Sequence, residues 1–213
     1  MSRPTDADIV KARAALAAAD PVMARADAAV APLTWRLRPA GFEGLVKMVV
    51  EQQVSTAAAA AIWKRFSEGL GQVTPEIVLA SDETHLRSFG LSGQKARYAR
   101  AIAEAGELFH EMETLSDTDA VARLTAIKGV GRWTAETYLL FAEGRMDLFP
   151  AGDIALQEGL RLLEGAEARL SEKAFYLRSE AWRPYRSVAA FLLWGYYMVA
   201  KGRAPLAELE KSA

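Results

Sequence analysis

Two stretches of the 213-residue chain combine residue types that can do chemistry. The first is Lys128-Gly129-Val130-Gly131, which stands between two apolar helical patterns. Glycine has no Cβ, so this turn accepts a positive φ, and the helix after it presents unpaired N–H groups and a positive dipole end. We expect Gly129, Val130, Gly131 and Arg132 to bind a phosphate. A tight turn without any ligand is the alternative interpretation of the tetrapeptide alone.

The second stretch ends in Asp153, which follows the Phe149-Pro150 stop and stands twenty residues after Trp133. An aspartate at the start of a helix is commonly only a cap. A carboxylate there can also stabilise positive charge on a sugar as a base leaves, or orient an attacking water. Trp133 and Trp194 are typical of a helical core, but their faces can also stack on an extruded, cationic base.

Composition narrows the classes of protein. The absence of cysteine excludes disulfides, thiol chemistry and an iron–sulfur cluster, and two isolated histidines are too few for a typical zinc site. A net charge of −1 argues against a nonspecific coat for nucleic acid, although it leaves room for local positive charge. No apolar run long enough for a membrane span and no targeting signal are visible, so we expect a cytoplasmic protein, nucleoid-associated in a bacterium.

Alanine, leucine, glutamate and arginine dominate, and no alternating pattern long enough for a strand occurs, so the sequence predicts an all-α fold. The helices expected near the chemistry cover residues 42–53, 56–69, 93–112, the hairpin at about 118–143, a long helix whose first turn contains Pro184, and a short tail helix near 204–212. Gln52 and Gln53 stand at the end of the first of these helices, where the apolar helical pattern is interrupted. They are either ordinary surface residues or amides that bond base edges.

The helix that Ser92 caps carries Lys95, Arg97 and Arg100 in its first turns. A run of this kind is usually a solvated face. Contact with phosphate is the alternative.

Several stretches together resemble a known family. LTAIKGVGRWTAETYLLF followed by DLFPAGDIALQ is similar to the helix-hairpin-helix superfamily of DNA base-excision glycosylases, and most similar to its alkylation-damage branch, the 3-methyladenine DNA glycosylase II type. VVEQQVSTAAAAAIW, LRSFGLSGQKARYARAIAEA and WRPYRSVAAFLLW resemble further segments of that family in the same order. The resemblance covers residues 42–201.

The resemblance implies roles for individual residues. Asp153 matches the catalytic aspartate, and the base pocket is implied for Trp133, Trp194, Thr137 and Gln52. Gln53 matches the wedge that fills the gap left by a flipped nucleotide. The hairpin at Gly129, Val130, Gly131 and Arg132 matches the grip on DNA phosphate. The backbone carbonyls of Thr125, Ile127 and Val130 match the site where some members hold a monovalent cation; no other cofactor is implied.

The departures from the family are informative too. Trp133 stands where bifunctional relatives place a Schiff-base lysine, so a monofunctional enzyme is expected. Thr137 replaces an aromatic residue, which implies a wider or more polar pocket. The residues before 42 read as helical, which implies a compact form without the N-terminal sheet domain of larger members. We therefore expect residues 1–213 to form a single glycosylase domain of two helical lobes.

The leading hypothesis is a monofunctional DNA glycosylase that excises alkylated purines of the 3-methyladenine and 7-methylguanine type from double-stranded DNA by hydrolysis of the N-glycosidic bond. It is expected to act as a monomer away from membranes. Three alternatives remain: a non-catalytic helix-hairpin-helix protein that binds damaged DNA, a glycosylase of the same superfamily for other damaged bases, and a helical protein without a nucleic-acid role.

Overall fold

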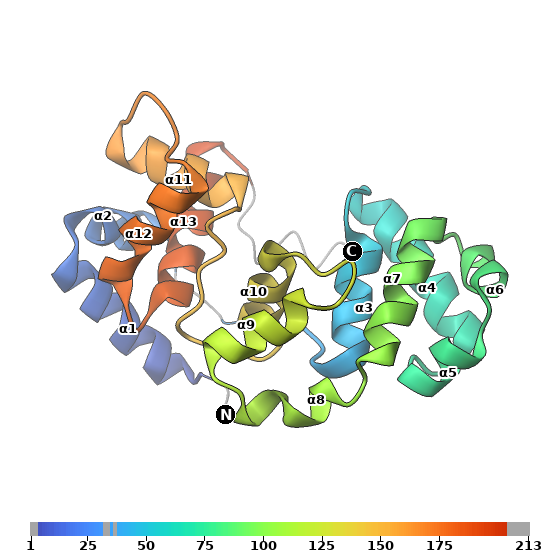
Figure 1. Cartoon of the computed structure of the whole chain (residues 1–213). Coiled ribbons are helices and arrows are strands. Elements are labelled where there is room, and N and C mark those ends of the chain that lie inside the picture. The colour runs from blue at the N-terminus through green and yellow to red at the C-terminus, as the bar shows by residue number, and fades with distance from the viewer. Residues whose placement is uncertain (1–3, 32–34, 36–37, 204–213) are drawn as a thin grey trace. The chain divides into compact units, whose positions relative to one another are not determined.

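A computed structural model of the chain describes residues 4–31, 35 and 38–203. All regular elements in these residues are helices, so the predicted all-α class is confirmed. The chain divides into two compact units (Figure 1). Among the described residues, unit 1 contains 38–143, and unit 2 contains 4–31, 35 and 144–203.

Unit 1 is built around an apolar helix, α3 (Gly41–Glu51), which packs against α4, α7 and α10 (Figure 1). Most of its residues are buried, because its apolar side chains recur on more than one face. The other elements of unit 1 are α4 (Thr56–Leu70), α5 (Pro75–Ala80), α6 (Glu83–Ser88), α7 (Gly93–Glu104), α8 (Leu108–Glu111), the 3₁₀ turn η1 (Met112–Thr114), α9 (Asp117–Thr125) and α10 (Arg132–Phe141).

Side-chain caps decide where many of these helices begin. The hydroxyl or carboxylate of the residue before each helix accepts a backbone N–H from its first turn, which satisfies a donor that has no partner within the helix. The caps of this kind in unit 1 are Ser55, Thr74, Asp82, Ser92 and Ser116.

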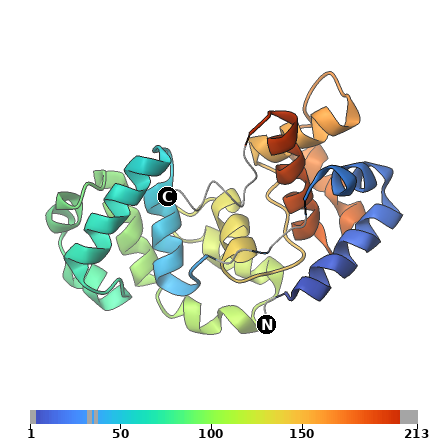
Figure 2. The ribbon, with the colours of Figure 1, turned by 180° about the vertical axis from the view of Figure 1, so that it is seen from behind.

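Unit 2 is built around α13 (Arg186–Ala200), whose sequence is apolar over most of its length. Figure 2 shows α13 among the other helices of the unit, and it packs against α1, α2 and α11. Gly159 allows the close approach of α11, because a Cβ there would lie 2.6 Å from the carbonyl oxygen of Leu193. The other elements are α1 (Asp6–Ala19), α2 (Pro21–Ala29), α11 (Ile154–Glu164), α12 (Glu172–Ser179) and the 3₁₀ turn η2 (Glu180–Trp182).

Two helices of unit 1 end earlier than the sequence predicted. The helix expected over 42–53 ends at Glu51, because the backbone of Gln52 is extended. The helix expected over 93–112 ends at Glu104, and α8 follows separately. At the break, a Cβ on Gly106 would meet the ring of Pro75 at 3.0 Å, so glycine lets this turn lie against the start of α5.

Pro184 also differs from the prediction. It was expected in the first turn of the long helix, but α13 begins at Arg186. The N–H of Tyr185 donates to the carbonyl of Trp182, so Pro184 belongs to the turn before the helix. The predicted tail helix lies outside the described residues. Within the described part of the chain, no helix has the length and apolar character needed to cross a membrane.

The loop between α10 and α11 is fastened to the first turn of α13. The hydroxyl of Ser187 donates to the carbonyl of Arg145 at 2.7 Å and accepts the N–H of Leu148 at 3.0 Å. Asp147 forms an ion pair with Arg186 at 2.8 Å. Because Ser187 is fully buried, these bonds are shielded from water, and the loop that leads to Asp153 is held to α13.

We predict that Ser187→Ala lowers the free energy of unfolding by about 1–3 kcal/mol, because it leaves the buried N–H of Leu148 without its hydroxyl acceptor. Ser179→Ala is the matched control. Ser179 is equally buried, but its hydroxyl only donates to the carbonyl of Tyr176 in its own helix. Denaturant unfolding of both variants measures the difference, and equal midpoints would contradict the role given to Ser187.

Candidate functional site

The hairpin between α9 and α10 is shaped by Gly129. Its φ is +94°, a conformation that side chains rarely adopt. A Cβ at this position would also lie 2.2 Å from the ring of Tyr98 on α7. The turn therefore requires glycine for two reasons, its backbone conformation and its contact with Tyr98.

The beginning of α10 has the features expected of an anion site. Gly131 is its N-cap and makes no side-chain capping bond. The helix dipole and the N–H groups of the first turn thus favour a negative ligand. Arg132 follows, and its side chain is 59% exposed while its Nε donates to Glu136 at 2.9 Å. This ion pair ties the guanidinium to a carboxylate one turn further along α10.

Trp133 and Thr137 lie one turn apart on α10 and differ in exposure. Trp133 is 40% exposed, which is unusual for so large an apolar side chain. Thr137 is buried, and its hydroxyl donates to the carbonyl of Trp133 at 2.6 Å. The structure therefore shows an accessible aromatic side chain in the first turn of α10; the pocket roles of both residues stay predictions.

The two glutamines after α3 have different environments. The side-chain amide of Gln52 donates to the hydroxyl of Thr134 on α10 at 2.9 Å, whereas Gln53 is exposed. Gln53 has a φ of +56°, and no other non-glycine residue in the described ranges has a positive φ. The structure thus ties the proposed pocket residue Gln52 to the hairpin helix and presents the proposed wedge, Gln53, at the tip of a tight turn.

The basic residues of α7 bond to other parts of the protein, which the sequence did not predict. The ammonium group of Lys95 donates to the carbonyls of Val50 and Gln52 at the end of α3, at 2.6 and 2.7 Å. Arg100 donates to carbonyls at the end of α5, and Arg97 pairs with Glu83. Lys95 and Arg100 therefore bind backbone carbonyls of other helices, which differs from both interpretations of the sequence, a solvated face and a phosphate contact.

Helical spacing contained a signal for Lys95. It stands four residues before Ala99 and seven before Ile102, and both are fully buried. A lysine on the same face as buried residues is expected to contact protein atoms. Which atoms they are depends on α3, a distant segment in the sequence.

Asp153 is the N-cap of α11. Its Oδ1 accepts the N–H groups of Ala155 at 2.8 Å and Leu156 at 3.0 Å. Trp194 Nε1 donates to the same oxygen at 3.2 Å. Asp153 is therefore a helix cap, as the first interpretation said. The three hydrogen bonds also hold its carboxylate in one orientation beside the indole ring of Trp194.

The turn before Asp153 is also held by hydrogen bonds. The N–H of Asp153 donates to the carbonyl of Pro150 at 2.9 Å, and Gln157 Nε2 donates to the carbonyl of Ala151 at 2.8 Å. The next residue, Ile154, is 66% exposed. An oriented carboxylate thus lies beside an accessible apolar side chain.

The predicted site residues fall into two sets, each within one unit. Unit 1 contains the hairpin with Trp133 and Thr137, together with the turn of Gln52 and Gln53; unit 2 contains Asp153 and Trp194. In the described part of the chain, no group of three or more histidine, aspartate or glutamate side chains is arranged to hold a metal ion.

A helical fold with this hairpin, and a capped aspartate after it, defines a class of DNA repair proteins. The family model described as HhH-GPD superfamily base excision DNA repair protein matches residues 46–184. The chain belongs to this superfamily, so the family predicted from the sequence is confirmed.

Among individual proteins, the chain is similar to several that are named 3-methyladenine DNA glycosylases or glycosidases. DNA-3-methyladenine glycosylase 1 of Schizosaccharomyces pombe is 37% identical over 162 residues, which cover 72% of this chain and 71% of the relative. A DNA-3-methyladenine glycosidase structure from Bacillus halodurans matches with a TM-score of 0.80 at 33% identity, covering 92% of this chain and 94% of that one. The structure of an S. pombe 3-methyladenine DNA glycosylase in complex with abasic DNA matches with a TM-score of 0.73 at 34% identity, covering 86% and 95%.

We predict that Gly129→Ala weakens binding to abasic DNA by at least about tenfold, since an alanine here is strained and collides with Tyr98. The same strain lowers the midpoint of thermal unfolding. Fluorescence anisotropy with labelled duplexes measures the first effect, and calorimetry measures the second.

Gly131→Ala is the control for folding. Gly131 has a negative φ, and a Cβ there would meet nothing within 4 Å. Its unfolding midpoint should fall less than that of Gly129→Ala, because alanine at this position is only a poorer N-cap and meets no clash. A Gly129→Ala variant that unfolds at the same temperature would contradict the requirement for glycine.

Proposed function

We propose that this protein is a monofunctional DNA glycosylase that excises alkylated purines of the 3-methyladenine and 7-methylguanine type in base excision repair. The observation that carries the proposal is the oriented carboxylate of Asp153 beside Trp194, in a chain whose relatives are named DNA-3-methyladenine glycosylases. These relatives support the enzyme class, a hydrolase of N-glycosyl bonds.

Binding of double-stranded DNA is the task of unit 1 in this proposal. The N–H groups at the start of α10 and the hairpin backbone at Gly129, Val130 and Gly131 bind a phosphate, and Arg132 adds a positive charge. A matching structure contains abasic DNA, which supports this role. Because the chain has a net charge of −1, the attraction to DNA comes from these local groups.

Gln53 is the proposed wedge that enters the duplex when the damaged nucleotide leaves the stack. Extrusion costs a few kcal/mol, and a side chain that fills the gap offsets part of that cost. An exposed amide at the tip of a tight turn suits this task, because it can donate to and accept from base edges. Trp133, Thr137 and Gln52 are the proposed base-binding residues of unit 1, and Trp194 is that of unit 2, beside Asp153.

The proposed reaction breaks the C1′–N bond of the damaged nucleotide. A purine alkylated at N3 or N7 is cationic, so it leaves as a neutral base with the bonding electron pair and needs little acid catalysis. The sugar becomes an oxocarbenium ion, which the carboxylate of Asp153 stabilises. Water then adds to C1′ and loses a proton, which leaves an abasic site.

The residue in the lyase position makes the proposed enzyme monofunctional. Bifunctional members of the superfamily use a lysine amine there, and this chain has Trp133. An indole cannot form a Schiff base with the sugar, so strand cleavage is not part of the proposed reaction.

The hairpin carbonyls of Thr125, Ile127 and Val130 are the proposed ligands of a monovalent cation. The geometry is compatible with this role, since Ile127 accepts only the N–H of Val130 among the hairpin's backbone bonds, at 3.0 Å, and a carbonyl oxygen has two lone pairs. A cation held there would supply positive charge against a DNA phosphate.

Base release from methylated DNA tests the function. The protein is incubated with DNA treated with a methylating agent, and the released bases are separated by chromatography. We expect 3-methyladenine and 7-methylguanine together with alkali-labile abasic sites. If DNA is bound but no base is released, the non-catalytic alternative is correct.

We predict that Asp153→Asn lowers the excision rate at least about 100-fold while binding to abasic DNA is retained. Asparagine is as good an N-cap as aspartate, so this substitution removes the negative charge and keeps the start of α11. Single-turnover excision and anisotropy titrations measure the two effects. Excision at the wild-type rate would rule out Asp153 as the catalytic carboxylate.

We also predict that Trp194→Phe lowers the single-turnover rate about tenfold, because Asp153 loses one of the donors that orient it. Trp35→Phe is the matched control in the same unit. Trp35 is also buried and contacts Phe191, but among the described residues its Nε1 has no hydrogen-bond partner. A rate that falls equally in both variants would show that the indole N–H of Trp194 has no special role.

A further inference from the structure

We propose that Lys95 is a positioning residue, which holds the turn of Gln52 and Gln53 so that Gln53 is preorganised to enter the DNA duplex. This inference rests on the proposed function, because it assigns a purpose to the wedge. It adds a residue on another helix that touches neither the DNA nor the damaged base.

The ammonium group of Lys95 joins two helices. It donates to the carbonyls of Val50 at 2.6 Å and Gln52 at 2.7 Å. The last carbonyls of a helix such as α3 find no backbone N–H partner within the helix, so the ammonium supplies a donor for them. A positive charge at this end also interacts favourably with the helix dipole. Burial lowers the pKa of Lys95 from its ordinary value, because part of the water around the ammonium is replaced by protein.

The backbone just after these carbonyls is strained. Gln53 has a φ of +56°, which costs a non-glycine residue about 1–3 kcal/mol. Such a conformation persists only when its surroundings hold it. Lys95 binds the carbonyl of the residue immediately before Gln53, and Gln52 also bonds to Thr134 on α10 at 2.9 Å. Two tethers from different helices therefore hold the turn.

The same helix also shapes the hairpin. Tyr98 stands three residues after Lys95 on α7, and its ring fills the space beside Gly129. The contacts connect α7 to the hairpin in two ways within unit 1. Lys95 binds Gln52, which bonds to Thr134 on α10. Tyr98 lies against Gly129, in the hairpin just before α10. The proposed wedge and the proposed phosphate grip therefore rest on one face of α7.

This arrangement has an energetic consequence for extrusion of the base. A wedge that is already in its inserting conformation does not have to lose conformational entropy when DNA binds. Without the Lys95 contacts, the turn can relax toward ordinary φ values, and ordering it again would weaken binding.

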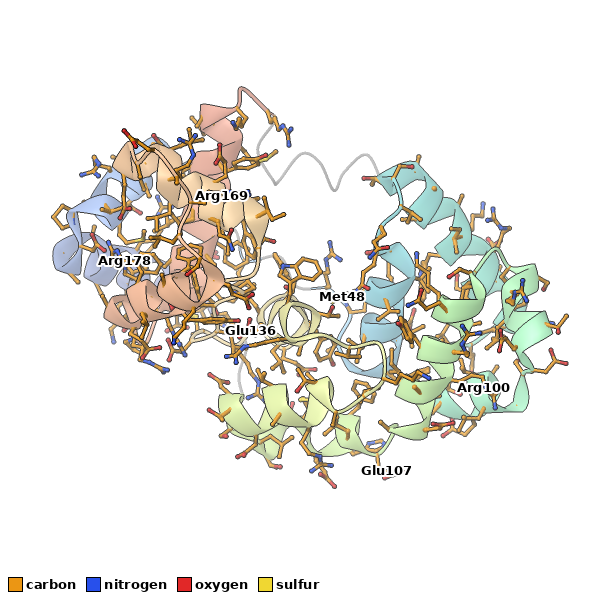
Figure 3. All side chains as sticks on the ribbon, turned by 45° about the horizontal axis from the view of Figure 1, so that its top comes forward. Met48, Arg100, Glu107, Glu136, Arg169 and Arg178 are labelled. Carbon is orange, nitrogen blue, oxygen red and sulfur yellow. The ribbon has the colours of Figure 1, made fainter. Side chains whose placement is uncertain are left out.

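Arg100 provides a matched control. It lies on α7 as well (Figure 3), and it donates to the carbonyls of Val78 and Leu79 near the end of α5 at 3.4 and 3.2 Å, and also to that of Ser81. It thus makes the same kind of cap on a different helix. A substitution there removes a similar structural contact and leaves the turn of Gln53 in place.

The experiment uses a duplex with a stable abasic analogue and 2-aminopurine beside it, whose fluorescence rises when stacking is broken. Titrations are carried out with wild type and with Lys95→Met, Lys95→Arg, Arg100→Met, Gln53→Ala and the double variant Lys95→Met/Gln53→Ala. We expect Lys95→Met to weaken binding about tenfold and to reduce the fluorescence rise, while Lys95→Arg restores most of both. Arg100→Met should bind as wild type does.

The double variant decides between positioning and simple stabilisation. If Lys95 acts through Gln53, then Lys95→Met adds no further loss in the Gln53→Ala background. Additive losses, an equal loss in Arg100→Met, or a wild-type protein that produces no fluorescence rise would each overturn the proposal. Base release is measured separately on methylated DNA, so a protein that unstacks the duplex without excision would contradict only the proposed function.

Discussion

The site residues of unit 2 are organised around one oxygen atom, Oδ1 of Asp153, which accepts two backbone N–H groups and the indole N–H of Trp194. The backbone bonds begin α11, and the indole bond ties that helix to α13. Ser187 and Asp147 hold the loop before Asp153 to the first turn of α13. The carboxylate is thus oriented by the first turn of α11 and by Trp194 of α13, and the loop before it is held to the same helix α13. The role proposed for Asp153, electrostatic stabilisation of a sugar cation, requires such preorganisation.

In unit 1, the predicted site residues are held by contacts with a single helix, α7. Here two turns, the one at Gln53 and the hairpin at Gly129, both have backbone conformations with positive φ. Positive φ is strained only at Gln53, where the ammonium of Lys95 on α7 binds the neighbouring carbonyls, while the ring of Tyr98 on the same helix lies against Gly129. Loops that bind DNA are commonly mobile; these are fastened to a helix, so less entropy is lost when a ligand binds.

Much of this protein follows from local signals. The sequence predicted Ser92 as a helix cap, and the structure confirms it; Ser55 and Ser116 cap α4 and α9 in the same way. Asp153 was expected at or near the start of a helix, and it is the N-cap of α11. The errors concern the ends of helices. The helix after Ser92 is interrupted near Gly106, which lies against Pro75 of α5, a contact between distant segments. Pro184 stays outside α13 in a local turn, in which Tyr185 bonds to Trp182.

The sequence by itself determined the all-α class and the hairpin with its two glycines, because helix periodicity, capping and glycine requirements are local properties. The resemblance of its motifs to a known family indicated the superfamily. The sequence placed Lys95 only in a basic run, and it could not show what Trp194 or Gln52 would bond. Their partners, Asp153 for Trp194 and Thr134 for Gln52, lie 41 and 82 residues away in the chain. Only the tertiary structure decided these pairs, since hydrogen bonds between distant segments depend on how helices pack and not on the pattern within any one of them.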